Sequence, residues 1–168
     1  MLIYHPAFDV NHARLRLIQL VDAASPPELS FDLLRILDFY FLFPHLLANI
    51  QLTRGMTRLK RELGTRANKY NRVPSPRTLI RQMEGVQETA IRALEAVRLV
   101  EFPLTSISIV KRSSAPLPDG LVKVINEQPE AERGLAQALA TEIAKIPLNG
   151  PDGLKARTGL LEYRYDPA

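Results

Sequence analysis

The sequence contains no cysteine among its 168 residues. Disulfide bonds, thiolate nucleophiles and cysteine-based zinc sites are therefore excluded. Glycine is also scarce, and the eight glycines form neither a phosphate-binding loop nor the Gly-x-Ser-x-Gly turn of serine hydrolases. Nucleotide binding and hydrolysis are accordingly not expected of this chain. The sequence predicts a protein that is not an enzyme by itself and needs no cofactor.

Long uninterrupted hydrophobic runs are absent as well. The N-terminus has neither the basic start nor the apolar stretch of a signal peptide. The most apolar segment, residues 31–47, is interrupted by Asp32, Arg35, Asp38, Pro44 and His45. Charges and a proline at this density favour a buried helix over a membrane span. We therefore expect a cytoplasmic protein with no membrane partner.

Hydrophobic residues make up 46% of the chain and charged residues 24%, which is the balance of an ordinary globular protein. The length fits one domain, residues 1–168. Apolar residues at helical spacing predict helices over residues 10–24, 31–43, 54–63, 78–99, 121–128 and 129–146. Alternating patterns predict short strands at 2–4, 104–110 and 160–165.

Several residues mark where these helices begin and end. Asp9 or Asn11 is a candidate cap for the first helix, and Ser30 for the second. Pro44 is expected to end the second helix, and Ser75 followed by proline is typical of the start of another. A break near Gly85 would divide the long helix 78–99 in two.

The predicted fold class is mainly α with a few short strands (α+β). The order helix, helix, basic helix, long helix, strand indicates a winged-helix-like helical domain. Its core would span about residues 10–111, followed by a C-terminal helical and strand extension over about 119–166. Other short mixed α+β domains share this order of elements. The winged helix is therefore a more specific prediction than the fold class.

The helix 31–43 is apolar around almost its whole circumference. Such a helix is either central to its own domain or covered by a partner chain. We predict a partner interface at Phe39, Tyr40, Phe43 and Asp38. Asp38 could also be a perturbed acid or base, but a carboxylate paired with an arginine is the favoured interpretation.

Three histidines and one aspartate raise the question of a metal site. The spacing His5-x3-Asp9-x2-His12 superficially resembles a ligand set. A metal site needs at least three convergent ligands, and Pro6 interrupts the backbone between the first two. Capping and surface roles are therefore favoured, and no metal is predicted.

Positive charge is concentrated in residues 54–81. This window has nine basic residues and one acid, so it carries +8 whereas the whole chain carries +4. A phosphate-binding surface for nucleic acid is one explanation, and a patch for an acidic partner protein or a solvated helix face are the others. The candidate nucleic-acid-binding residues are Arg54, Arg58, Lys60, Arg61, Arg66, Lys69, Arg72 and Arg77.

Three segments together resemble a known family. They are Tyr-His-Pro-Ala-Phe-Asp at residues 4–9, Leu-Arg-Ile-Leu-Asp-Phe-Tyr-Phe-Leu-Phe-Pro-His at 34–45, and Gly-Leu-Lys-Ala-Arg-Thr-Gly-Leu-Leu-Glu-Tyr-Arg-Tyr-Asp at 153–166. They resemble the middle-component proteins of bacterial ABC-three-component systems. The central segment is the most specific, and the similarity runs nearly from end to end.

The resemblance implies a small accessory subunit encoded beside an ABC ATPase of the chromosome-maintenance (SMC-like) type and beside an effector. Such systems are thought to sense invading phage or plasmid DNA and to trigger a defence response. The implied role is a non-catalytic adaptor that bridges ATPase and effector and contacts double-stranded DNA. No catalytic residues follow from the resemblance. The alternative function is a winged-helix transcriptional regulator that binds DNA through residues 54–81.

Overall fold

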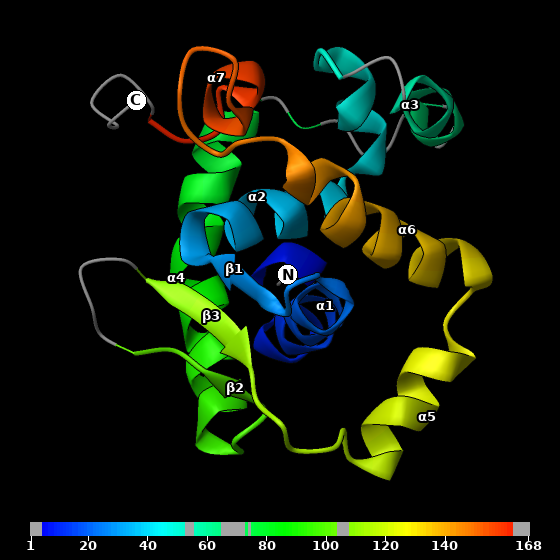
Figure 1. Cartoon of the computed structure of the whole chain (residues 1–168), viewed down its shortest axis with the longest axis vertical. Helices are drawn as coiled ribbons and strands as arrows, with labels where there is room; N and C mark the ends of the chain where they lie inside the picture. The colour runs from blue at the N-terminus through cyan, green and yellow to red at the C-terminus, as the bar shows by residue number, and fades with distance from the viewer. Residues whose placement is uncertain (1–4, 53–55, 65–72, 74, 104–107, 163–168) are drawn as a thin grey trace.

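The computed structural model describes residues 5–52, 56–64, 73, 75–103 and 108–162 (Figure 1). The helical elements in chain order are η1 (Pro6–Phe8), α1 (Val10–Ala23), α2 (Phe31–Leu42), η2 (Pro44–Asn49), α3 (Thr57–Gly64), α4 (Pro76–Ala96), α5 (Asp119–Glu127), α6 (Glu130–Thr141), η4 (Ile143–Lys145) and α7 (Leu154–Thr158). The strands are β1 (Glu28–Ser30), β2 (Val100–Glu101) and β3 (Ile109–Arg112). A mainly α fold with a few short strands is confirmed.

The predicted helix starts coincide with side-chain caps. Asp9 accepts a hydrogen bond from the backbone N–H of His12 at the start of α1. Ser30 caps α2 in the same way, and Ser75 caps α4, where Pro76 occupies the first turn. These bonds satisfy N–H groups that have no partner inside the helix. Pro44 follows α2 and opens η2, as its missing N–H leads one to expect.

The three strands form one antiparallel sheet in the order β1-β3-β2. Leu29 lies opposite Val110, and Val100 lies opposite Arg112. Since β1 connects α1 to α2, the sheet joins the beginning of the fold to the strands that follow α4. The winged-helix arrangement stays a prediction.

The core is built around α1, which Figure 1 shows end-on near the centre of the molecule. It packs against α4, α6 and α2. The sheet lies beside α1 and α4, and α7 lies near the start of α4. The buried apolar side chains from Ala7 to Leu160 form one continuous cluster. Its own chain buries helix α2 from Leu34 to Tyr40, and the two ends of the helix are partly exposed.

Some predicted elements differ from the structure, and others lie outside the described residues. Helix α4 runs without interruption through Gly85, so the expected break is wrong. The last predicted strand has no strand at residues 160–162, and its remainder lies outside the described residues. The strand at 2–4 and most of the predicted strand at 104–110 are also outside them, although β3 begins at Ile109. Helix α7 was not predicted, because five residues are too few for a recognisable period.

Candidate partner-binding and nucleic-acid surfaces

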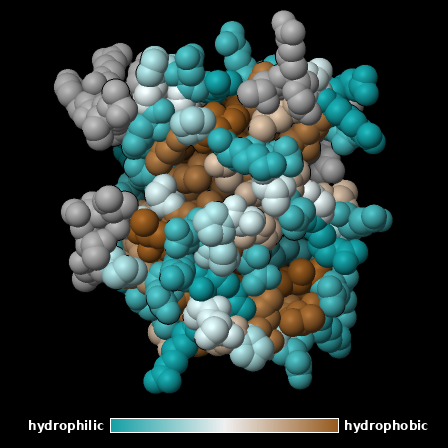
Figure 2. All heavy atoms as spheres, viewed as in Figure 1, coloured by the Kyte–Doolittle hydropathy of each residue, from teal (hydrophilic) through white to brown (hydrophobic). Residues whose placement is uncertain are grey.

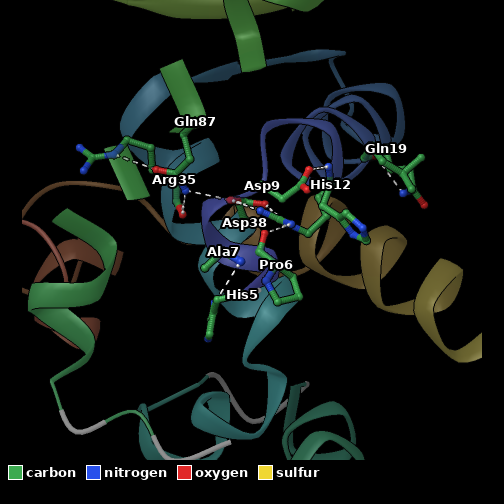
Figure 3. A network of polar contacts seen from close by, with 11 residues as sticks. His5, Pro6, Ala7, Asp9, His12, Gln19, Arg35, Asp38 and Gln87 are labelled. Carbon is green, nitrogen blue, oxygen red and sulfur yellow. Dashed lines mark hydrogen bonds and ion pairs between the residues drawn. The ribbon is translucent and has the colours of Figure 1, made fainter. Parts of the chain in front are cut away.

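A polar network crosses the buried centre of the molecule, with Asp38 at its middle (Figure 3). The Nε of Arg16 donates to Oδ1 of Asp38 at 2.6 Å, and its Nη2 donates to Oδ2 at 3.2 Å. Gln87 donates a third hydrogen bond, from Nε2 to Oδ2, at 2.9 Å. The carboxylate on α2 is therefore held by α1 and α4 together.

The pairing explains why a charged residue is tolerated there. Asp38 is fully buried and Arg16 is 7% exposed, so each charge is removed from water. An isolated buried charge is strongly unfavourable, whereas a pair with further hydrogen bonds is tolerated. The remaining nitrogen of Arg16, Nη1, donates to the carbonyl oxygen of Pro6 at 3.2 Å. This geometry supports the favoured interpretation of Asp38 as a paired carboxylate, with an arginine of its own chain.

Arg35 extends the network in the opposite direction. Its Nε donates to Oε1 of Gln87 at 3.3 Å, and its Nη2 donates to Glu84 at 3.0 Å. Gln87 thus accepts from Arg35 and donates to Asp38, which orients its amide. On α2, Asp32 connects Arg35 to α7, because Lys155 Nζ lies 2.8 Å from its Oδ2. The network therefore links α1, α2, α4 and α7.

The aromatic residues predicted to face a partner lie inside the fold. Phe39 is fully buried, Tyr40 is 3% exposed and Phe43 is 5% exposed. The ring of Phe39 lies 5.5 Å from that of Tyr40 and 5.1 Å from that of Phe43. Burial raises the pKa of the Tyr40 phenol. Together with fully buried Asp38, these residues leave almost no surface for another protein to contact, so we place the partner interface elsewhere.

The histidine and aspartate side chains near the N-terminus act as helix caps. His5 Nδ1 accepts a hydrogen bond from the backbone N–H of Ala7 at 3.2 Å, and Asp9 caps α1. Across the described residues, no cluster of three or more His, Cys, Asp or Glu side chains could hold a metal ion. The observed role of His5 is to cap η1, and that of Asp9 is to cap α1.

Four of the eight candidate nucleic-acid-binding residues fall within the described part of the chain. Arg58 pairs with Glu62 on the same helix at 2.8 Å, and this pairing raises the pKa of its guanidinium. Lys60 Nζ donates to the carbonyl oxygen of Ile50 at 2.9 Å. Arg77 lies 3.0 Å from the carboxylate of Glu162. Arg61 is exposed on α3.

These contacts reduce the charge that the described residues offer to a phosphate. Arg58 remains 83% exposed, so its pair with Glu62 is weak and can exchange for a phosphate oxygen. Helix α3 packs chiefly on η2 at the edge of the molecule (Figure 1). The other candidates, Arg54, Arg66, Lys69 and Arg72, lie outside the described residues. The nucleic-acid surface therefore stays a prediction.

Comparison with known proteins identifies the family. Residues 2–166 match the family described as ABC-three component (ABC-3C) system Middle Component 5. The chain belongs to this family. No curated protein and no solved structure matches it. The resemblance seen in the sequence is thereby confirmed, and the chain is an accessory component of an ABC-three-component system.

A middle component has other components to contact, so its exposed apolar surface is informative. None of the helices in the described ranges is long and apolar enough to cross a membrane. Among those ranges, four large apolar side chains are exposed: Phe8, Val97, Val122 and Val124. Two of them, Val97 and Val124, line one groove of about 360 Å³ beside α5. This surface has no clear signal in the sequence, because helical spacing does not show which side of so short a helix stays uncovered.

Proposed function

We propose that this middle component is a non-catalytic adaptor that bridges the ABC ATPase and the effector of its system. The system would act in the cytoplasm against phage or plasmid DNA. The observation that carries the proposal is the family match over residues 2–166. An adaptor needs a stable body and exposed contact surfaces, and it needs no catalytic groups of its own.

The buried network supports this role. Hydrogen bonds join Asp38 to both Arg16 and Gln87. They bind no substrate from this position, since Asp38 is fully buried. Their effect is to hold α1, α2 and α4 in one arrangement, which gives a rigid body between two partners.

Reconstitution from purified components tests the adaptor. The ATPase, the effector and this chain are mixed in pairs and together, and complexes are measured by mass photometry. The adaptor predicts a ternary complex, and little association of ATPase with effector when this chain is omitted. Equal association without the chain, or a chain that binds neither component, would contradict the proposal.

A second candidate is direct binding of double-stranded DNA, including the winged-helix regulator. It is supported by the +8 charge of residues 54–81 and by the β1-β3-β2 sheet order. On the exposed side of α4, Arg77 and Arg81 come first, and Glu84 and Glu88 follow. This change of sign favours a DNA contact at the start of α4 and on α3, because carboxylates repel phosphates.

The two candidates differ in how they bind DNA. A regulator is expected to bind a short specific duplex alone, usually as a symmetric dimer. An adaptor is expected to bind weakly and without sequence preference until the ATPase is present. Fluorescence anisotropy with random and selected duplexes, at several salt concentrations, separates them, since phosphate contacts give a steep salt dependence.

A further inference from the structure

Helix α5 is the least integrated helix of the described chain. It has no buried residue, although Leu121, Val122, Val124 and Ile125 are apolar. Figure 1 shows it at the periphery, joined to β3 and to α6 by extended segments. Hydrophobic surface gathers in the region of Figure 2 that α5 and its surroundings occupy. An amphipathic helix normally buries its apolar side, so this arrangement leaves apolar surface uncovered.

The apolar residues of α5 divide between two hollows. Leu121 and Val124, three residues apart, line the groove of about 360 Å³. Val122 and Ile125, also three residues apart, line a second hollow of about 300 Å³ on the other side. Residues at this spacing share one side of a helix. Helix α5 therefore lies between the two hollows, and each hollow is lined by residues of both α5 and α1.

The groove on the Leu121 side is the more apolar of the two. Its floor includes Ile18 of α1 and Leu94 of α4, which are buried. Its rim includes Val97, which is 54% exposed, and Val124, which is 46% exposed. Because its floor is buried and its rim is exposed, the groove can accept apolar side chains of another segment.

The charge at the groove is basic. Arg14 of α1 is the one charged residue that lines it, and the described residues provide no carboxylate partner for it. Arg98 follows Val97 but lines a different hollow, together with Glu95 and Glu101, so Arg14 supplies the charge of this groove. Asp119 is next to the lining residue Pro118. Its negative charge is partly balanced by the positive end of the α5 helix dipole, because it lies in the first turn of that helix. An occupant with acidic residues flanking an apolar stripe would complement this rim.

We propose that this groove docks an amphipathic helix of another component of the system, with apolar residues at spacings of three and four and acidic residues beside them. Helices in the walls of a groove commonly receive a helix in this manner. The occupant's apolar side would contact Val97, Leu121 and Val124, and a carboxylate beside it would pair with Arg14. This inference rests on the proposed adaptor function and assigns it a surface.

The test uses the full chain with the purified ATPase and effector. Val97→Asp and Val124→Asp are expected to weaken binding of one component about tenfold or more, because they place a charge in the apolar contact. Arg14→Glu is expected to weaken it through repulsion, with a smaller effect at high salt. Phe8→Asp is the matched control, since Phe8 is also 46% exposed but does not line the groove. Thermal melting confirms that each variant is folded.

Cross-linking identifies the occupant and keeps the test independent of folding. A photoreactive amino acid at position 97 or 124 is expected to cross-link to an acidic amphipathic segment of another component. Lysine substitutions in that segment should then restore binding to the Arg14→Glu variant. Cross-links to a second copy of this chain, or to a segment without acids, would overturn the proposal.

The outcomes distinguish a failure of the groove assignment from a failure of the adaptor function. Complexes that form as well with the groove variants as with the wild type would overturn the groove and leave the adaptor function intact. A wild-type chain that binds neither ATPase nor effector would overturn the adaptor function, and the groove assignment with it.

Discussion

The guanidinium of Arg16 holds both carboxylate oxygens of Asp38, with Nε 2.6 Å from Oδ1 and Nη2 3.2 Å from Oδ2. The two residues are 22 positions apart in the chain, on α1 and α2. Both side chains are buried, so removing either partner would leave the other charge buried and unpaired, which is strongly destabilising. It fixes how the two central helices meet and thereby the surfaces that the fold presents.

Removing one partner of this pair should destabilise the protein. Asp38→Ala leaves Arg16 charged and buried without a carboxylate, and the free energy of unfolding should fall by about 3–5 kcal/mol. Urea denaturation followed by circular dichroism measures this. The control is Glu127→Ala, which removes an exposed pair with Lys123 at 3.9 Å and should cost about 0.5 kcal/mol or less.

The double variant Arg16→Met with Asp38→Leu distinguishes a buried unpaired charge from a loss of packing. Both charges are then gone, and apolar replacements of buried pairs are often neutral. We expect the double variant to recover most of the stability lost in Asp38→Ala. A double variant as unstable as the single one would show that the ion pair is not the reason for the loss.

A second prediction concerns pH and Glu95. The hydrogen bond from Arg92, and then the N–H of Phe102, lower the pKa of this carboxyl below its ordinary value of 4.5. A lowered folded-state pKa adds stability above the unfolded-state value, and this is lost as pH falls through the folded-state pKa. Glu95→Gln should therefore lower the free energy of unfolding at neutral pH. The difference from wild type should disappear in acid, and a pH-independent difference would contradict the role of the charge.

The third prediction tests the basic surface. Reversing charge at Arg58, Arg61 and Arg66 should abolish binding to double-stranded DNA while the fold stays intact, because phosphate contacts supply non-specific affinity. A control with the same change in net charge uses the exposed residues Lys111, Lys123 and Arg133, each changed to Glu. Anisotropy at low salt measures both. Unchanged affinity in the first variant would remove the nucleic-acid role from that surface.

The sequence predicts much of the fold because the helices carry local signals. Ser30 and Ser75 occupy cap positions, and the apolar spacing between them and the helix ends is regular. The partner of Asp38 has no such signal. Arg35 is three residues away and looks like the obvious partner, yet it turns towards Gln87 and Glu84. Only the packing of α1 against α2 brings Arg16 to the carboxylate.

The sequence likewise predicts some features of the candidate surfaces, whereas others depend on the fold. Charge counting finds the basic window 54–81, but it does not show that Lys60 reaches Ile50 O or that Arg77 meets Glu162. A helix apolar all round suggests a partner interface at Phe39, whereas the fold itself covers that residue. The exposed apolar surface instead comes from Val97 and Val124, whose exposure depends on how loosely α5 packs.

The final prediction compares two glycines. A Cβ at Gly153 would overlap the carbonyl oxygen of Asn149 and lie 2.8 Å from that of Leu148, so the backbone before α7 would have to move. Gly153→Ala should cost about 1–3 kcal/mol and loosen α7, whose Lys155 reaches Asp32. Gly85 has nothing within 4 Å of the added atom and lies inside α4. Gly85→Ala should therefore stabilise the protein by about 0.5–1 kcal/mol, because alanine favours helix more than glycine.

Thermal and urea unfolding of the two variants provides the measurement. Opposite signs are expected from the same chemical change, since one site lacks room for a methyl group and the other has it. Equal small effects at both positions would show that the turn before α7 adjusts freely. In that case Gly153 would not hold α7 in place, and contacts such as that of Lys155 with Asp32 and that of Arg157 with the carbonyl oxygen of Gln51 would position it.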